Sequence, residues 1–223
     1  VGRGIAAGAG VSLERIMLLN SRYEMTKQPV PHECTTAAVL PEASANGHTY
    51  LIKNWDYRPG ILEHIVLVKI LKPDGTRIFG ITEAGQFLRD GFNSCGFGIC
   101  SNSISSLQDG KHAGIPVTFL RHAYLNQTDF QTARDQFIRL PRGVSNHSIL
   151  ADRTAGAVGL ECLPDFTGQY SPIAGILSHA NHLVTVPWLE ADKSEPKFRD
   201  VRLQFLLQRK RGSIDVPYIQ NCL

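Results

Sequence analysis

The sequence contains no apolar run of about 18 residues, the minimum for a membrane-spanning helix, so we expect no membrane partner. It also lacks a basic stripe. Its 23 Lys and Arg residues and 20 Asp and Glu residues are spread along the chain and give a net charge of +3, so we expect no nucleic acid partner. The one dense basic run, at residues 209–211, follows an amphipathic segment and is explained by a solvated helix end.

The cysteine pattern indicates neither a disulfide framework nor a metal site. Five cysteines, at positions 34, 95, 100, 162 and 222, are an odd number without short repeated spacing. This argues against a secreted disulfide scaffold, and we expect an intracellular location, cytoplasmic or peroxisomal. Cys95 with Cys100, and His179 with His182, resemble halves of zinc sites, but neither has a second half, so no metal is expected. We predict that Cys95, Cys100 and Cys162 are core residues.

Residues 34–57 contain the main candidate for chemistry. Two apolar segments rich in β-branched residues, 34–40 and 51–57, flank a turn-rich interval at 41–47 and predict a β-hairpin whose far ends meet. Cys34 and Asp56 would then be neighbours. A thiol that begins a strand beside hydroxyl groups and a carboxylate is a candidate nucleophile. The alternatives are an inert buried thiol for Cys34 and a surface carboxylate for Asp56.

The rest of the chain groups strands with strands and helices with helices. Asp74 and Gly75 between two alternating runs are a strong hairpin signal, and Asp129 is a candidate helix N-cap. The predicted helices are 13–20, 116–126, one from 130, and one whose apolar face contains Phe198, Val201, Phe205 and Leu206. The predicted strands are 64–71, 77–82, 91–101, 148–151 and 157–162, with a strand pair or bent strand at 176–186. The pattern indicates an α+β fold around an antiparallel sheet.

Short motifs, each weak alone, recur in one order from about residue 5 to about residue 207. They are Leu19-Asn20-Ser21-Arg22 with Glu24, Cys34-Thr35-Thr36-Ala37, Asn54-Trp55-Asp56, Ile81-Thr82-Glu83-Ala84-Gly85, Gly91-Phe92-Asn93-Ser94, Gly114-Ile115-Pro116, and His179-x-Asn181-His182. In these motifs the chain resembles the isopenicillin N acyltransferase family, also called acyl-coenzyme A:6-aminopenicillanic acid acyltransferases. Members of this family are autoprocessing N-terminal nucleophile hydrolases.

The resemblance implies a four-layer αββα sandwich that is made as a precursor. In this family the protein cuts the peptide bond before its own cysteine, which here joins Glu33 to Cys34. Residues 1–33 would be the end of the propeptide or α-chain region, and residues 34–223 the catalytic β-chain region of the same domain. The α and β chains would remain partners after cleavage.

The resemblance also implies roles for single residues. Asn181 resembles the oxyanion-hole donor, Asp56 the carboxylate beside the nucleophile, and Thr36 a threonine close to the cleaved bond, whereas Glu83 and Asn93 match structural or pocket-lining positions. Without the resemblance, Asn181 would be an ordinary turn asparagine. His179 or His182 would be an alternative base in a papain-like Cys-His pair.

The chain departs from the family in three respects. Glu33 stands where members often have glycine, and Leu163 falls near the position of a serine that assists processing in the penicillin enzyme. A further active-site Ser-Arg pair would lie beyond Leu223. We therefore expect the chain to be truncated at both ends, without an N-terminal helical part and the last strands of the sandwich.

The resulting functional expectation is an autoprocessing cysteine acyltransferase or amidohydrolase. It would form a thioester on Cys34 from a small amide or an acyl-coenzyme A thioester and pass the acyl group to an amine or to water. No cofactor is expected, and coenzyme A enters only as a candidate co-substrate. The alternative is an unprocessed, catalytically impaired fragment or fold relative that acts as a binding protein.

Overall fold

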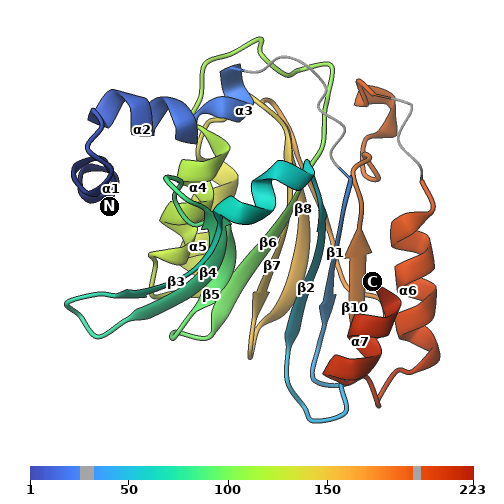
Figure 1. Cartoon of the computed structure of the whole chain (residues 1–223). Helices are drawn as coiled ribbons and strands as arrows, with labels where there is room; N and C mark the ends of the chain where they lie inside the picture. Colours follow the sequence, from blue (N-terminus) through green and yellow to red (C-terminus); the bar gives the residue numbers. More distant parts are fainter. Residues whose placement is uncertain (26–32, 193–196) are drawn as a thin grey trace.

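A computed structural model describes residues 1–25, 33–192 and 197–223, and of Glu33 the backbone alone. The sequence also predicts a loop at residues 28–33, because it contains Pro29 and Pro31, and residues 28–32 lie outside the described ranges. The helices are α1 (Gly2–Ala9), α2 (Leu13–Asn20), α3 (Arg22–Met25), α4 (Val117–Leu125), α5 (Phe130–Arg139), α6 (Arg199–Arg209) and α7 (Val216–Cys222), with 3-10 helices η1 (Pro59–His64) and η2 (Pro187–Leu189). Figure 1 shows their arrangement around two sheets.

All neighbouring strands in the two sheets are antiparallel. The strands are β1 (Glu33–Val39), β2 (Tyr50–Asp56), β3 (Ile65–Leu71), β4 (Arg77–Glu83), β5 (Asp90–Asn93), β6 (Phe97–Ser103), β7 (Asn146–Asp152), β8 (Gly156–Cys162), β9 (Thr167–Tyr170) and β10 (Ile176–His179). Within the described residues, the large sheet runs in sequence order from β3 to β9, and the small sheet has the order β10-β1-β2. The central strand of the small sheet is therefore the one that carries Cys34.

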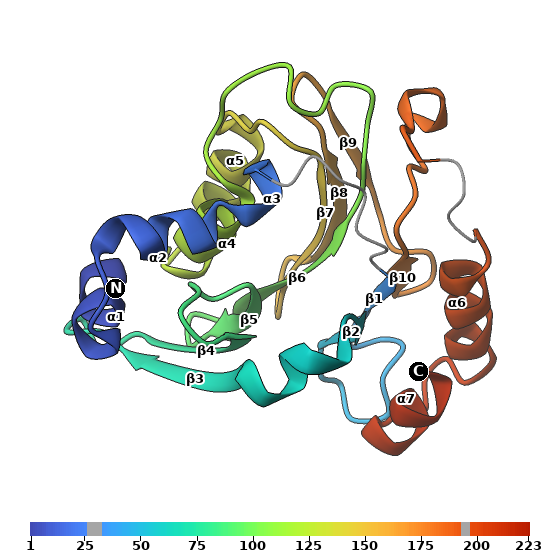
Figure 2. The ribbon, with the colours of Figure 1, turned by 45° about the horizontal axis from the view of Figure 1, so that its top comes forward.

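Three apolar clusters show that the molecule is layered. One joins α4 and α5 to the outer face of the large sheet, through residues such as Leu120, Phe137 and Ile99. A second joins α6 and α7 to the outer face of the small sheet, through Leu203 and Leu207 among others. A third, formed by Ala38, Cys100, Ile149 and Leu177, lies between the sheets. The order helix, sheet, sheet, helix is visible in Figures 1 and 2 and confirms the expected αββα sandwich.

Most of the predicted elements are confirmed. The hairpin over residues 34–57 forms as β1 and β2, and the Asp74-Gly75 turn joins β3 to β4. Asp129 caps α5 by accepting a hydrogen bond of 2.7 Å from the Thr132 backbone nitrogen. Cys100 and Cys162 are buried in the core, and Cys95 is half-buried against it.

The predicted strand at residues 91–101 is wrong, because two strands form there. β5 ends at Asn93 and β6 begins at Phe97, and the turn between them contains Gly96 at φ 100°. This backbone conformation is favourable for glycine and strained for other residues, so the glycine marks a turn between strands and not a bulge within one strand. The prediction at 176–186 is also too long, because β10 ends at His179.

The predicted apolar face of α6 is not the face that packs on the sheet. Phe198, Val201 and Phe205 are each more than 60% exposed, whereas Leu203 and Leu207 are buried in the cluster with the small sheet. Both sets of apolar residues recur at helical spacing. The periodicity alone therefore did not show which set packs on the sheet, and the predicted face was the wrong one. In the described part of the chain, every helix is too short or too polar to cross a bilayer.

Candidate active site

The hairpin places Cys34 at the end of the central strand of the small sheet. Its direct neighbour on β2 is Trp55, and the preceding pair is Glu33 with Asp56. Because side chains alternate along a strand, Cys34 and Thr36 share a face with Ala38, which lies between the two sheets. The Cys34 side chain therefore faces the interior of the sandwich, and the residue is only 4% exposed.

Two side chains form hydrogen bonds to the backbone of Cys34, in addition to the backbone pairing between strands. Its nitrogen donates to Asn181 Oδ1 over 2.6 Å, and its carbonyl oxygen accepts from Arg199 Nη1 over 2.9 Å. Arg199 Nη2 also donates to Asn181 Oδ1, at 3.0 Å. Pairing between β1 and β10 begins only at Thr36 with His179, so Asn181 extends the hydrogen bonding of β10 past the end of that strand. The three residues form one connected unit.

In this uncut chain, both the oxygen and the nitrogen of the Asn181 side-chain amide form hydrogen bonds. Its oxygen accepts from Cys34 and Arg199, while its nitrogen Nδ2 donates to the Ser103 carbonyl oxygen over 2.7 Å. The bond to Ser103 ties the segment after β10 to the end of β6, across the sandwich. The oxyanion-donor role of Asn181 stays a prediction, because it concerns a charge that develops during a reaction.

The environment of the Cys34 thiol contains charges of both signs. Burial raises its pKa, and the carboxylates of Asp90 and Asp56 act in the same direction. Lys53 and Arg89 act in the opposite direction without reversing the shift. In the uncut chain the thiol is therefore held mainly in its protonated form near neutral pH.

Lys53 and Asp90 link the two sheets beside this thiol. Lys53 lies on β2, opposite Thr36, and its Nζ is 2.6 Å from Asp90 Oδ2 on β5. Burial alone would raise the pKa of Asp90, but Lys53 and the nearby Arg121 bring it below its usual value. The pair is thus a buried, charged contact between β2 and the large sheet.

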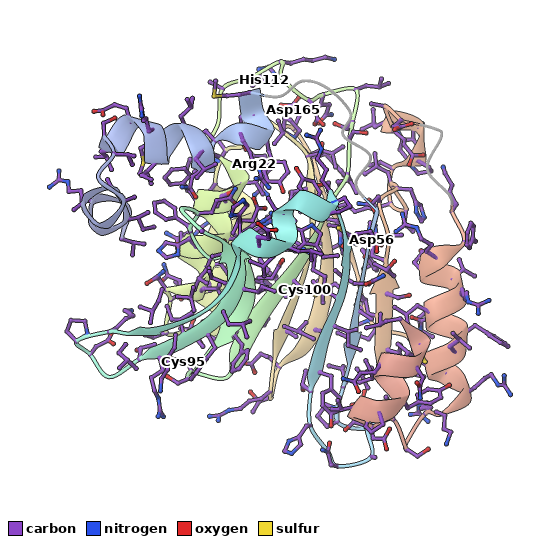
Figure 3. All side chains as sticks on the ribbon, viewed as in Figure 1. Arg22, Asp56, Cys95, Cys100, His112 and Asp165 are labelled. Carbon is purple, nitrogen blue, oxygen red and sulfur yellow. The ribbon has the colours of Figure 1, made fainter. Side chains whose placement is uncertain are left out.

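The remaining predicted site residues lie close to this unit. Asp56 ends β2, where Figure 3 shows it near the top of the strand, and both its carboxylate oxygens accept from Asn54 Nδ2, at 3.3 and 3.4 Å. Thr36 Oγ1 accepts from Asn102 Nδ2 on β6 over 3.0 Å. The backbone of Glu33 belongs to β1 and pairs with Asp56.

The short helix α3 packs on the large sheet next to the site. Arg22 contacts the Glu83 carboxylate through two bonds of 2.5 Å, and Arg89 contacts the same carboxylate at 2.5 Å. Arg89 also bonds to the Tyr23 hydroxyl, and its guanidinium lies 4.7 Å from the centre of the Trp55 ring. Figure 3 shows Arg22 on α3, facing the sheet. Residues 22 and 23, which the family resemblance would place in the α-chain region, are thereby attached beside Cys34.

Sequence reasoning did not find Arg199, Lys53, Asp90 or Asn102. Lys53 had a weak signal, since it shares the strand face of Cys34's partner Trp55, two residues along β2. Arg199 had no sequence signal, because only the packing of α6 on the small sheet brings its side chain to Cys34. In the ranges that the structure describes, no three His, Cys, Asp or Glu side chains are grouped so that they could hold a metal ion.

Comparison with known proteins shows the family and the fold of the chain. A sequence profile of the family "Acyl-coenzyme A:6-aminopenicillanic acid acyl-transferase" matches residues 43–213, a span that contains Asp56, Asn181 and Arg199 and begins after Cys34. The acyl-coenzyme A:6-aminopenicillanic-acid-acyltransferase 40 kDa form of Emericella nidulans is 28% identical over 183 residues. That alignment covers 80% of this chain and 50% of the relative, so the chain spans about half the length of this curated relative.

Solved structures share the fold. An N-acylethanolamine-hydrolyzing acid amidase ortholog from Caenorhabditis elegans superposes with a TM-score of 0.63 at 18% identity, over 85% of each chain. A variant of conjugated bile acid hydrolase from Clostridium perfringens gives a TM-score of 0.57 at 14% identity, over 85% of this chain and 78% of the other. With a profile match over most of its 223 residues, the chain belongs to the acyl-coenzyme A:6-aminopenicillanic acid acyl-transferase family.

Proposed function

We propose that this chain is a cysteine acyltransferase or amidohydrolase that cuts itself between Glu33 and Cys34 and then uses Cys34 as the nucleophile. The observation that carries the proposal is the pair of contacts to the Cys34 backbone. Asn181 holds the nitrogen that would become the free amine, and Arg199 holds the carbonyl oxygen of the same residue. Both partners are polar side chains that reach Cys34 from outside the pairing of β1 with β10, which begins only at Thr36.

Self-cleavage would proceed through the thiol of Cys34. The sulfur attacks the Glu33 carbonyl carbon, the bond from that carbon to the Cys34 nitrogen breaks, and the thiol proton passes to the nitrogen. Water then hydrolyses the resulting thioester. The products are a Glu33 carboxyl terminus and a Cys34 that carries a free thiol and a free α-amine.

Turnover would use both groups of the new terminus. The α-amine, with a pKa near ~8, accepts the thiol proton, and the thiolate attacks the carbonyl carbon of the acyl donor. The leaving amine or thiol takes that proton as the donor bond breaks, and a thioester forms on Cys34. An amine or water then attacks the thioester and regenerates the thiol. Asn181 Oδ1 lies where it would accept a hydrogen bond from the α-amine and fix its orientation.

The substrate class follows from this chemistry and from the family. An acyl-enzyme of this kind forms from either an amide or an acyl-coenzyme A thioester, and the names of the two relatives describe both kinds of donor. We propose a small amide or an acyl-coenzyme A thioester as donor, with an amine or water as acceptor. Neither step requires a metal or a resident cofactor.

Intact mass measurement of the freshly purified protein tests this proposal. We expect two fragments, residues 1–33 and 34–223, whose masses sum to that of the chain plus one water molecule. A Cys34→Ala variant should remain a single chain, because it lacks the attacking sulfur. A single chain in both proteins would overturn self-cleavage and would favour the alternative of an unprocessed binding protein.

A further inference from the structure

His179 and Glu161 form a buried ion pair between the two sheets, close to Asn181 in the chain. His179, the last residue of β10, and Glu161, on β8, are both fully buried, and His179 Nε2 is 2.9 Å from Glu161 Oε1. The other ring nitrogen of His179, Nδ1, is 2.6 Å from the Ala180 carbonyl oxygen. Both ring nitrogens of His179 therefore lie within hydrogen-bond distance of an oxygen acceptor.

Glu161 also holds the segment that follows Asn181. Its Oε1 accepts from the Val184 nitrogen at 2.6 Å, and its Oε2 accepts from the Thr185 nitrogen at 2.8 Å and from the Thr185 hydroxyl. Burial alone would raise the pKa of Glu161, but the bonds from His179 and Thr185 lower it. The carboxylate is therefore ionised, and it anchors the chain on both sides of Asn181.

Two further residues enclose this ion pair. Asn102 Nδ2 donates to the carbonyl oxygens of His179 and Ala180, each at 2.9 Å, as well as to Thr36. The ring of His147, on β7, stacks on that of His179 with centroids 3.6 Å apart and planes inclined by 13°. β7 and β8 face β1 and β10 across the sandwich, as Figure 1 shows. The peptide that joins His179 to Asn181 is therefore fixed from the large sheet.

We propose that His179, held by Glu161, is a positioning residue that fixes the amide of Asn181 against Cys34. This inference rests on the proposed function of Cys34. The ion pair touches no reacting atom, because Asn181 and the Ala180 peptide lie between it and Cys34. Its effect on the reaction is the placement of that amide, and displacement of a catalytic group by about 1 Å typically costs on the order of 10²-fold in rate.

The test measures the pre-steady-state burst of p-nitrophenol released from p-nitrophenyl hexanoate. The wild-type protein is compared with the variants Glu161→Gln and His179→Gln. The burst amplitude counts competent molecules, and the burst rate constant reports acylation of Cys34. A positioning role predicts a full amplitude per folded molecule, an unchanged half-saturating ester concentration, and a rate constant lower by about 10²-fold. A purely structural role predicts a smaller amplitude with an unchanged rate constant, and that result would overturn the inference.

His182→Gln is the matched control. His182 is also buried, flanks Asn181 on its other side, and stacks on His179 with centroids 5.7 Å apart, but it makes no hydrogen bond to the peptide on either side of Asn181. It should keep the burst rate constant within about threefold, a margin below the effect of a misplaced catalytic group. An equal loss in His182→Gln would overturn the proposal, since the effect would then not require the bonds made by the ion pair.

Two results separate this inference from the proposed function. A wild-type protein without a Cys34-dependent burst would count against the nucleophile itself. A wild-type burst with unchanged rate constants in Glu161→Gln and His179→Gln would count against the positioning role alone. If Glu161→Gln does not fold, Thr185→Val removes one donor from the carboxylate, and the inference then requires a several-fold slower burst at full amplitude.

Discussion

The backbone nitrogen of Cys34 donates to Asn181 Oδ1 over 2.6 Å, a contact between residues 147 positions apart in the sequence. It lies just past the point where β1 and β10 stop pairing, so a side chain replaces the next ladder bond. A cut before Cys34 would leave the pairing of β1 with β10 intact, because that pairing begins at Thr36. This relationship leads to the first prediction.

Replacing Asn181 with alanine should slow both self-cleavage and acylation of Cys34. The substitution removes the acceptor of the Cys34 nitrogen, the bond to Ser103 and the predicted oxyanion donor, and loss of one such donor typically costs ~10²–10³ in rate. The fraction of cleaved chain over time, measured by intact mass, gives the rate. Asn126→Ala, at the end of α4, should behave as wild type, and a change of less than threefold in Asn181→Ala would contradict the prediction.

Arg199 should not be replaceable by lysine. Its two terminal nitrogens bond to different acceptors, Cys34 O and Asn181 Oδ1, and a single ammonium cannot reproduce this planar fork. We expect Arg199→Lys and Arg199→Met to lower the burst rate constant by on the order of 10- to 100-fold. Stopped-flow absorbance at the p-nitrophenol band measures it.

Arg202→Met controls for the loss of a positive charge from the same helix. Arg202 is one turn further along α6 and is exposed. The same substitution should leave the rate unchanged there. Equal effects of Arg199→Met and Arg202→Met would show that the charge of α6 matters and that the fork does not.

Local pattern was sufficient for the hairpin that carries the candidate nucleophile. The apolar and β-branched residues of 34–40 and 51–57 and the turn residues between them predict β1, β2 and the placement of Cys34 next to the end of β2. The helix N-cap at Asp129 and the Asp74-Gly75 turn could be predicted for the same reason, because each depends on residues close together in the sequence. Each of these signals acts over a few residues.

The rest of the site depends on contacts that no local pattern encodes. Arg199 reaches Cys34 because α6 packs through Leu203 and Leu207, and the sequence favoured the opposite face of that helix. The Lys53 and Asp90 pair joins strands from different sheets. Cys34 and Asp56 were candidates from the hairpin pattern, whereas Asn181 was identified only through the family resemblance, because it lies far from both in the sequence.

The uncut protein should show slow, pH-dependent alkylation of Cys34. Since burial raises the pKa of its thiol, the reactive thiolate is scarcer near pH 7 than in a free cysteine, and the rate should rise as pH increases through the usual thiol range. Iodoacetamide labelling followed by peptide mass analysis measures each cysteine separately. After cleavage, the adjacent ammonium favours the thiolate, so the profile should move to lower pH. A profile for the uncut chain that levels off below pH 8 would refute this expectation.

Lys53→Met should destabilise the protein in a pH-dependent way. It leaves the Asp90 carboxylate buried without its 2.6 Å partner, a loss of about 3–5 kcal/mol for a buried pair broken on one side. The paired carboxylate has a lowered pKa, so its contribution is present above the unfolded value of about 3.9 and disappears as pH falls.

Urea unfolding at pH 7 and near pH 4.5 measures this effect. In Lys53→Met the carboxyl is still buried but lacks its cation, so its pKa rises and the deficit in unfolding free energy should shrink at the lower pH. Lys53→Met with Asp90→Asn should recover part of the loss at pH 7, because the uncompensated charge is gone. A deficit that grows on acidification would contradict the assignment.

Cleaved protein should keep its 1–33 fragment, and Arg22 should contribute to that retention. Both terminal nitrogens of Arg22 bond to Glu83, so Arg22→Met should weaken the attachment by about 2 kcal/mol, or roughly 30-fold, as expected for hydrogen bonds to a charged group. Size-exclusion chromatography with mass analysis of the eluted peak measures co-migration. Arg15→Met removes an exposed cation from α2 and should retain the fragment as wild type does. Equal retention in both variants would show that Glu83 holds no part of the fragment through Arg22.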